Sequence, residues 1–396
     1  MNEYLTPQNL TSGISRLLSV NPVFKGLHLK VIVIANEKAG GFTQKSKSVK
    51  NKSKLETALL SAEKKQIIVD SLETELLITE YSGHAEKLVY EFLPEIISTR
   101  CSKNKLTMII TAGGDGTSLE VQSGLFKSAL ESEEKRNAVM NYICVLRLPL
   151  GTGNDGSDGH SFSETLEMLE SSLHFANARA VKVYVNEEAD FNQISLSGKN
   201  PSDYGDVNKK SPWFSFNIAG VGLDAFVCYM TNALKSKYPG NHYQMMVRFA
   251  TLKYNKKFPP QNAVVKVYNK DKLLETINEP FEMVVLGVSG HRTFGAGKKM
   301  FPLNDNFAFV KKLNVLPMVM NSGKFTDGTY INTDIAKTYS ATKIVLEYPY
   351  PILCEMDGET QLLLKENFPL TMELTEPCIR ILERDDLTFD RGAVRL

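Results

Sequence analysis

Short apolar runs alternate with longer segments of mixed polarity over the first half of the chain. Runs rich in β-branched residues occupy residues 29–35, 75–79, 108–110 and 143–148. Helical spacing of apolar residues fills the intervals at 55–65 and 85–97, the stretch from 119, and 163–173, with Ser163 as the predicted N-cap. Strand–helix–strand alternation of this kind predicts an open parallel sheet with helices on its faces.

The pattern changes near residue 178, after which short alternating segments are separated by polar turns. Such segments occupy residues 181–185, 214–218, 263–268, 281–288, 343–347 and 370–374. Many strands with few helices predict an antiparallel β-sandwich, with helices expected only within 224–252. The fold class is therefore an α/β N-terminal domain followed by a β-rich C-terminal sandwich domain. The predicted boundaries are an N-terminal extension at 1–28, the α/β domain at 29–177, the β-sandwich domain at 178–383 and a C-terminal tail at 384–396.

A glycine-rich turn follows the third apolar run. Gly113, Gly114 and Gly116 remove three side chains within four positions, so backbone N–H groups can approach a bound anion. The helix predicted after the turn adds its N-terminal partial charge, and Thr117 adds a hydroxyl. Asp115 would be costly beside a phosphate unless a metal ion or reacting hydroxyl is near. We therefore favour an anion site over a turn that binds nothing.

A second turn, which includes Gly151, Thr152 and Asn154, follows the fourth run. The first turn, Gly-Gly-Asp-Gly-Thr, resembles a superfamily shared by diacylglycerol kinases, sphingosine kinases and NAD kinases. The second, Leu-Pro-Leu-Gly-Thr-Gly-Asn-Asp, is similar to the signature of the diacylglycerol kinase catalytic domain. The resemblance implies that both turns bind the phosphates of ATP, the phosphate donor, and that Mg²⁺ accompanies the nucleotide.

Two further positions match this family in part. Asn36 and Thr79 each follow a predicted strand, where open parallel sheets place their ligands, and the resemblance implies that both belong to the nucleotide site. Glu37, Ala39 and His84 depart from the family pattern around them. These departures support an alternative, a non-catalytic nucleotide- or lipid-binding protein on the same fold.

The expected general base lies far downstream. Asp357-Gly358-Glu359 resembles a segment of bacterial lipid kinases, which implies that Glu359 takes the proton from a lipid hydroxyl. Asp-Gly is also a hairpin-turn signal, and a turn with exposed charges remains the alternative. Asp224, in the family-like stretch Gly-Val-Gly-Leu-Asp-Ala, is the rival base. Asp305 is the single acid where the family has a metal-binding Asp-Asp-Gly, so it is the candidate metal ligand, and loss of that site is equally open.

Overall charge and cysteine usage limit the partners and the cellular compartment that we expect. The formal net charge of +1 gives no reason to expect nucleic acid as a partner. Five cysteines without metal-type spacing indicate reduced thiols in a cytoplasmic protein. No apolar run approaches the ~20 residues that would span a bilayer. Five lysines crowd residues 45–54, which predicts a solvated, mobile loop or, alternatively, a loop that gathers phosphate or faces a membrane.

The combined expectation is an ATP-dependent lipid kinase. It would transfer the γ-phosphate of ATP to a hydroxyl of diacylglycerol, a sphingoid base or a related lipid at a membrane surface, by peripheral contact. The α/β domain would bind nucleotide and the β-rich domain substrate. A kinase of a small soluble alcohol is a third alternative, and a homodimer is left open.

Overall fold

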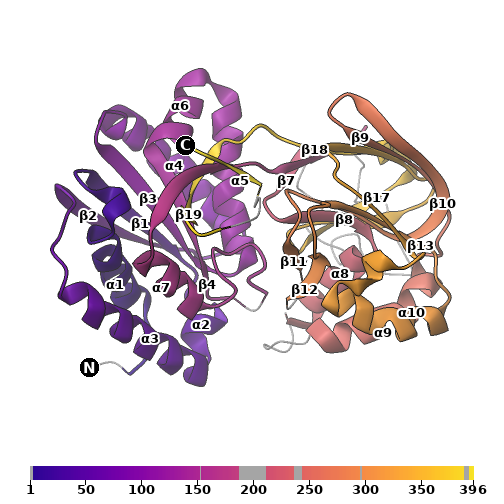
Figure 1. Cartoon of the computed structure of the whole chain (residues 1–396), viewed down its shortest axis with the longest axis horizontal. Coiled ribbons are helices and arrows are strands. Elements are labelled where there is room, and N and C mark those ends of the chain that lie inside the picture. Colours follow the sequence, from indigo (N-terminus) through magenta and orange to yellow (C-terminus); the bar gives the residue numbers. More distant parts are fainter. Residues whose placement is uncertain (1–2, 152, 187–210, 236–242, 295–296, 388–391) are drawn as a thin grey trace. The chain divides into compact units, whose positions relative to one another are not determined.

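A computed structural model describes residues 3–151, 153–186, 211–235, 243–294, 297–387 and 392–396. The chain forms two compact units (Figure 1). The first comprises Met1–Arg179 with Pro377–Thr388 and Ala393–Leu396, and most of the second is Ala180–Glu376. An N-terminal α/β unit and a C-terminal β-rich unit confirm the fold class expected from the hydrophobic pattern.

A seven-stranded sheet in the order β2-β1-β3-β4-β19-β5-β20 forms the centre of the first unit. Its strands are β1 (His28–Ala35), β2 (Ser71–Ile78), β3 (Lys105–Gly113), β4 (Ile143–Pro149), β5 (Leu173–Ala178), β19 (Ile379–Arg384) and β20 (Ala393–Arg395). The first four of these in spatial order are parallel, and β19 continues parallel to β4. β1, β3 and β4 are buried almost throughout, as their continuous apolar runs require of strands covered on both faces.

Helices cover both faces of this sheet (Figure 1). The helices are α1 (Pro7–Ser19), α2 (Gly40–Thr43), α3 (Lys45–Glu63), α4 (His84–Arg100), α5 (Asp115–Glu131), α6 (Glu133–Tyr142) and α7 (Phe162–Glu170), with a 3₁₀ turn at Pro22–Phe24. α1, α3 and α7 share one apolar core with alternate residues of β1, β3 and β4. α4, α5 and α6 contact one another and form the other layer.

The second unit is built on an eleven-stranded sheet, whose described pairings are antiparallel. Its strands are β6 (Val181–Tyr184), β7 (Trp213–Ser215), β8 (Ile218–Gly222), β9 (Asn262–Asn269), β10 (Lys272–Gly287), β13 (Phe307–Lys311), β14 (Ala336–Tyr339), β15 (Lys343–Glu347), β16 (Ile352–Met356), β17 (Glu359–Leu363) and β18 (Leu370–Leu374). β11 (Arg292–Phe294) and β12 (Lys298–Phe301) form a separate hairpin. β10 pairs with β9 along its first half and with β8 and β13 along its second, so the sheet curls around one core.

Among its described residues, this unit has the helices α8 (Leu223–Lys235), α9 (Tyr243–Lys257) and α10 (Val315–Asp327). α8 packs on β8, β16 and β17, and α9 packs on α8 (Figure 1). Short 3₁₀ turns lie at Thr329–Asn332 and Lys365–Asn367. Throughout the described ranges, no helix combines the length and the apolar character needed to cross a membrane.

Several boundaries differ from those expected. The predicted second domain reaches residue 383, but β19 lies between β4 and β5 of the first sheet, with Leu382 in its core. An apolar alternation identifies such a segment as a strand without saying which sheet receives it. The lysine-rich stretch 45–54 is the start of α3 and not a loop. α4 ends at Arg100 and not at residue 97, and the N-cap of α7 is Ser161 rather than Ser163.

Candidate functional site

The predicted phosphate-binding residues of the first unit come together at one edge of its sheet. Because β2, β1, β3 and β4 are parallel neighbours, the residues that follow them meet at their carboxyl ends. Thr79 N donates to Ala35 O at 2.9 Å, and Asn36 N donates to Ala112 O at 3.0 Å. Leu150 N donates to Gly113 O at 3.0 Å, which joins the two glycine turns.

The turns after β3 and β4 both require glycine, because other atoms occupy the positions where a side chain would begin. A Cβ on Gly113 would lie 2.5 Å from Thr117 Oγ1. A Cβ on Gly151 would lie 2.4 Å from Gly114 Cα, which is a clash with backbone. Gly114 is the N-cap of α5, and Gly116 lies in its first turn. The two turns therefore touch directly through their main chains, beside the amino end of a helix.

Asp115 fixes the second turn in place. Its Oδ2 accepts a hydrogen bond from Asn154 N at 2.7 Å, and its Oδ1 accepts one from Gly156 N at 3.2 Å. A Cβ on Gly153 would lie 2.5 Å from the same Oδ2. Asn154 itself has a positive φ of 62°. We expected a metal ion or a reacting hydroxyl to explain a carboxylate at this position. The structure offers a second explanation, because Asp115 accepts hydrogen bonds from backbone N–H groups of the second turn. Thr152 lies outside the described residues.

Two basic residues at this edge were not among the predicted site residues. Lys47, in the first turn of α3, donates from Nζ to Gly151 O at 2.6 Å, and burial lowers the pKa of its ammonium. Arg147, in β4, forms a buried pair with Asp158, its backbone N donating to Asp158 Oδ2 at 2.7 Å. Arg147 anchors the far end of the second turn, whereas Lys47 brings a positive charge to it. The helical position of Lys47 could have been found only by recognising α3 within the lysine run.

The side chains of the other two matched positions make local contacts. Asn36 Oδ1 accepts a hydrogen bond from Lys38 N at 3.0 Å, and Thr79 Oγ1 donates to Ala35 O at 3.4 Å. Both residues shape the loops that follow β1 and β2. A direct role for them in nucleotide binding stays a prediction.

The Asp-Gly-Glu segment of the second unit is the hairpin turn between β16 and β17. Asp357 and Gly358 both have positive φ, at 49° and 92°. Contrary to an exposed turn, Asp357 is half-buried. It accepts hydrogen bonds from Ser215 Oγ at 2.6 Å and from the backbone N of Phe216, Asn217 and Ile218 at 2.7–3.1 Å. Burial raises the pKa of Asp357, and these donors act against that rise. Glu359 is half-buried at the start of β17, and no described residue hydrogen-bonds to its carboxylate.

Asp224, the rival base, is 5% exposed in the first turn of α8. Its Oδ2 lies 1.9 Å from the point that a Cβ on Gly220 would occupy, and Gly222 has a φ of +112° against Glu282 O. These contacts explain both glycines of the Gly-x-Gly-x-Asp stretch. No described side chain hydrogen-bonds to the carboxylate of Asp224. Burial raises its pKa, and the backbone N–H groups of Ala225 and of Asp224 itself act against that rise.

The residues around Asp305 do not fit a metal ion. Asp305 Oδ2 accepts a hydrogen bond from Thr338 Oγ1, and Oδ1 accepts one from Ser340 Oγ, both at 2.8 Å. No group of three or more His, Cys, Asp and Glu side chains that could hold a metal is present in the described part of the chain. The carboxylate instead joins the loop before β13 to β14 and the residue after it.

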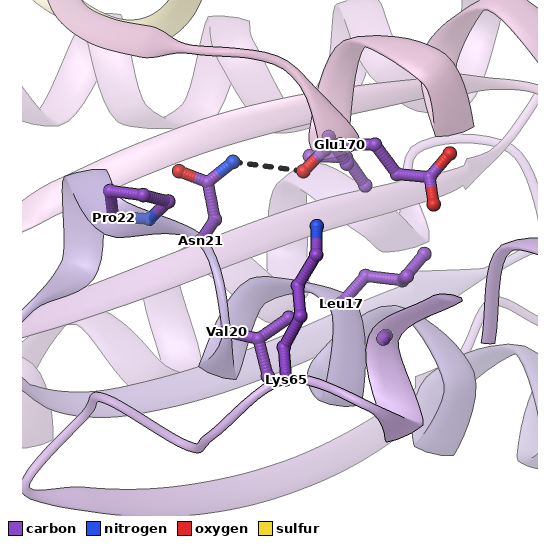
Figure 2. Close-up of a pocket in the computed structure, with 8 residues that line it drawn as sticks. Leu17, Val20, Asn21, Pro22, Lys65 and Glu170 are labelled. Carbon is purple, nitrogen blue, oxygen red and sulfur yellow. Dashed lines mark hydrogen bonds between the residues drawn. The ribbon is translucent and has the colours of Figure 1, made fainter. Parts of the chain in front are cut away.

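A small cavity of about 20 Å³ lies away from this edge (Figure 2). Leu17, Val20, Lys65 and Glu170 line it, at the ends of helices that return the chain to the amino ends of the strands. Asn21 Nδ2 closes one side by donating to Leu169 O at 2.8 Å (Figure 2). A cavity of this size holds about one water molecule, so it is no substrate site.

Known proteins resemble this chain in sequence and in fold. Residues 30–185 match the sequence model of the diacylglycerol kinase catalytic domain. The chain is 25% identical over 240 residues to a protein of Bacillus subtilis (strain 168) named "Putative lipid kinase YtlR". That alignment covers 60% of this chain and 65% of the relative, so this chain spans less than two thirds of the length of the curated protein it matches.

Two solved structures, each described as "a putative diacylglycerol kinase from Bacillus anthracis str. Sterne", share the fold. They are 19% and 18% identical to this chain, with TM-scores of 0.52 and 0.51. The matches cover 89% and 90% of this chain and 96% and 98% of those structures. The touching glycine turns lie within residues 30–185, so the part of the chain that carries them is similar in sequence to the diacylglycerol kinase catalytic domain.

Proposed function

We propose that this protein is an ATP-dependent lipid kinase that phosphorylates a hydroxyl of diacylglycerol, a sphingoid base or a related lipid. The observation that carries the proposal is the main-chain contact between the turn at Gly114 and the turn at Gly151, fixed by Asp115. Backbone N–H groups without intervening side chains, beside a helix N-terminus, bind phosphate oxygens. The family match and the relative's name support a phosphate-transfer role for this site.

Phosphoryl transfer requires positioning and neutralisation of the charge on the transferring group. Thr117 is largely buried and packs against Gly113, and it supports the first turn of α5. Lys47 supplies a positive charge within hydrogen-bond distance of the second turn. Asp115 positions that turn through its hydrogen bonds with Asn154 N and Gly156 N. Mg²⁺ would arrive with the phosphates of ATP as part of the donor, and no step is assigned to a metal at Asp305.

We further propose Glu359 as the general base. It opens β17 with a carboxylate that has no described hydrogen-bond partner, whereas the neighbouring Asp357 is fully engaged by four donors. A free carboxylate can accept the proton of an attacking hydroxyl when the two come within ~2.6–3.2 Å. Asp224 lacks access to solvent, which favours Glu359 over it.

The test is transfer of labelled γ-phosphate from ATP to acceptors in parallel reactions. Vesicles containing diacylglycerol or a sphingoid base should yield a phosphorylated lipid, and soluble polyols should yield nothing. Phosphorylated polyol would replace the proposal with a kinase of soluble alcohols. ATP or lipid binding without any transfer would replace it with a non-catalytic binding protein.

A further inference from the structure

Two neighbouring helices of the second unit carry large apolar side chains on their outer faces. Ala250 and Tyr254 of α9, and Phe258 directly after it, are buried at four-residue spacing in the core shared with α8. The opposite side of the same helix exposes Phe249 and Leu252, which are 46% and 56% accessible. α9 therefore buries one apolar face as most surface helices do, but large apolar side chains also lie on its solvent-exposed face.

α10 repeats this arrangement. Leu316 and Met320, one turn apart, are 70% and 74% accessible, the two largest values among the exposed large apolar residues of the described chain. α9 and α10 contact each other and lie side by side (Figure 1). Asn255 of α9 reaches the start of α10 by donating to Leu313 O at 3.1 Å. We call Phe249, Leu252, Leu316 and Met320, with the lysines described next, the α9–α10 outer face.

Lysines accompany the apolar side chains on both helices. Lys253 and Lys256 follow Phe249 and Leu252 by four residues, and Lys324 follows Met320 by four, so each lies on the same face as an apolar residue. All three are exposed, and none has an ion-pair partner within the described ranges. α9 contains no Asp or Glu, and the single acid of α10, Asp327, accepts hydrogen bonds from Thr329.

We propose that the α9–α10 outer face docks this protein onto a lipid surface that contains anionic phospholipid. The four apolar side chains would enter the boundary between headgroups and acyl chains, and the lysines would contact anionic headgroups, as interfacial amphipathic helices do. This inference rests on the proposed lipid kinase function, because such an enzyme must collect its substrate at a membrane. It replaces the lysine run at 45–54, which lies in α3, as the membrane-facing element.

A second copy of the chain fits this face less well. At about 200 Å² for a large side chain, the exposed fractions of the four residues amount to roughly 500 Å², against the ~800 Å² per partner of a stable interface. The three uncompensated lysines would also repel their counterparts across a symmetric contact. A negatively charged lipid surface satisfies both the apolar and the basic groups.

The experiment measures vesicle binding by sedimentation without ATP. Wild type should bind vesicles of phosphatidylcholine with about one third phosphatidylglycerol, and salt should weaken the binding. Leu252→Asn with Met320→Asn should lower the partition coefficient by roughly tenfold for each residue. Leu60→Asn is the matched control, because Leu60 is 62% exposed on α3 of the other unit, and it should bind as wild type does.

A second variant separates charge from apolar insertion. Lys253→Gln, Lys256→Gln and Lys324→Gln together should lower binding to the anionic vesicles by up to about fivefold per lysine, and remove most of its salt dependence. Thermal unfolding should be unchanged in both variants, since the replaced side chains are exposed. Wild-type binding by the Leu252→Asn, Met320→Asn variant, or no binding by wild type, would overturn the proposal. A wild-type dimer that this variant converts to monomer would also overturn it, in favour of a contact between copies.

Turnover distinguishes this inference from the proposed function. With a short-chain diacylglycerol dissolved as monomers, the Leu252→Asn, Met320→Asn variant should match wild type in kcat and KM, because no surface has to be reached. If vesicle binding depends on the α9–α10 outer face but the protein transfers no phosphate, the docking proposal stands and the kinase proposal is wrong. If the protein phosphorylates lipid but the variants bind vesicles as wild type does, the kinase proposal stands and the docking proposal is wrong.

Discussion

Gly151 and Gly156 lie in the same loop but differ in the space around their Cα atoms. A Cβ at Gly151 would lie 2.4 Å from Gly114 Cα, whereas a Cβ at Gly156 would have Asp115 Oδ1 as its nearest neighbour, at 3.9 Å. Gly151→Ala should therefore separate the two turns and lower ATP affinity by at least about tenfold. Gly156→Ala keeps its N–H donor and should bind ATP as wild type does. Calorimetric titration with ATP measures both, and equal affinities would contradict the proposed phosphate site.

Glu282 gives the protein a pH dependence near neutrality. Burial raises the pKa of its carboxyl from an ordinary 4.5 to about 7. Leu313 N and Asn255 Nδ2 donate to its Oε1 and Lys312 attracts its charge, and all three act against this rise. Tyr254 and Tyr348 are titratable groups near it. The folded protein therefore keeps a proton that the unfolded chain releases. The stability contributed by that proton is complete below about pH 4 and is lost as the pH rises through 7.

The variant Glu282→Gln removes this titration. Between about pH 4.5 and 7, the unfolding free energy of wild type should fall relative to the variant by up to about 1.4 kcal/mol per pH unit. Urea unfolding of both proteins across this range measures the difference. Parallel pH profiles would show that Glu282 is ionised in the folded protein.

At the scale of the element, the sequence predicted the strands of the parallel sheet better than the helices around them. β1, β3 and β4 are buried on both faces, so a short apolar run identifies each. The start of α3 buries only Ser48 and Asn51 among its first turns, and its lysines extend into solvent or along other groups. A helix with so narrow an apolar face gives a pattern much like that of a polar loop.

Recognition of α3 singles out one lysine of five. Lys47 reaches the second glycine turn, whereas Lys50 is exposed on the same helix. Lys47→Gln removes a charge-assisted contact and should raise the KM for ATP about tenfold, with kcat changed less. Lys50→Gln is the control and should leave both constants unchanged. Steady-state kinetics with ATP varied would refute a phosphate role for Lys47 if the two variants behaved alike.

At the scale of the molecule, the motifs identified two glycine turns that lie together in the first unit, but they revealed less about individual side chains in the second. Each glycine turn is a local feature, since strand, turn and helix are consecutive in the sequence. Asp357 is held by Ser215 and by the N–H groups that follow it, which lie far away in sequence, so no sequence spacing could reveal its role. The exposed apolar residues of α9 and α10 likewise become a surface only when the helices lie together.

Glu359 and the glycine turns belong to different units, so a variant at each separates binding from turnover. Glu359→Gln keeps the shape of the side chain but cannot accept a proton at neutral pH, and kcat should fall ~10²–10⁴-fold with nearly unchanged ATP affinity. Single-turnover transfer to lipid, with ATP binding measured separately, is the required assay. Full turnover by Glu359→Gln together with its loss in Asp224→Asn would move the base to Asp224.

The position of β19 has a consequence for the order in which the protein can fold during synthesis. The ribosome completes β1 to β5 early, but the strand that lies between β4 and β5 emerges only after the whole second unit has been made. N-terminal domains usually fold first as the chain appears. Here the sheet of the first unit lacks its strand between β4 and β5 until β19 has been made. Until then, the facing edges of β4 and β5 have no partner strand and can pair with other nascent chains. A nascent chain that ends at Glu376 would therefore contain most of the second unit, but the sheet of its first unit would still lack β19 and β20.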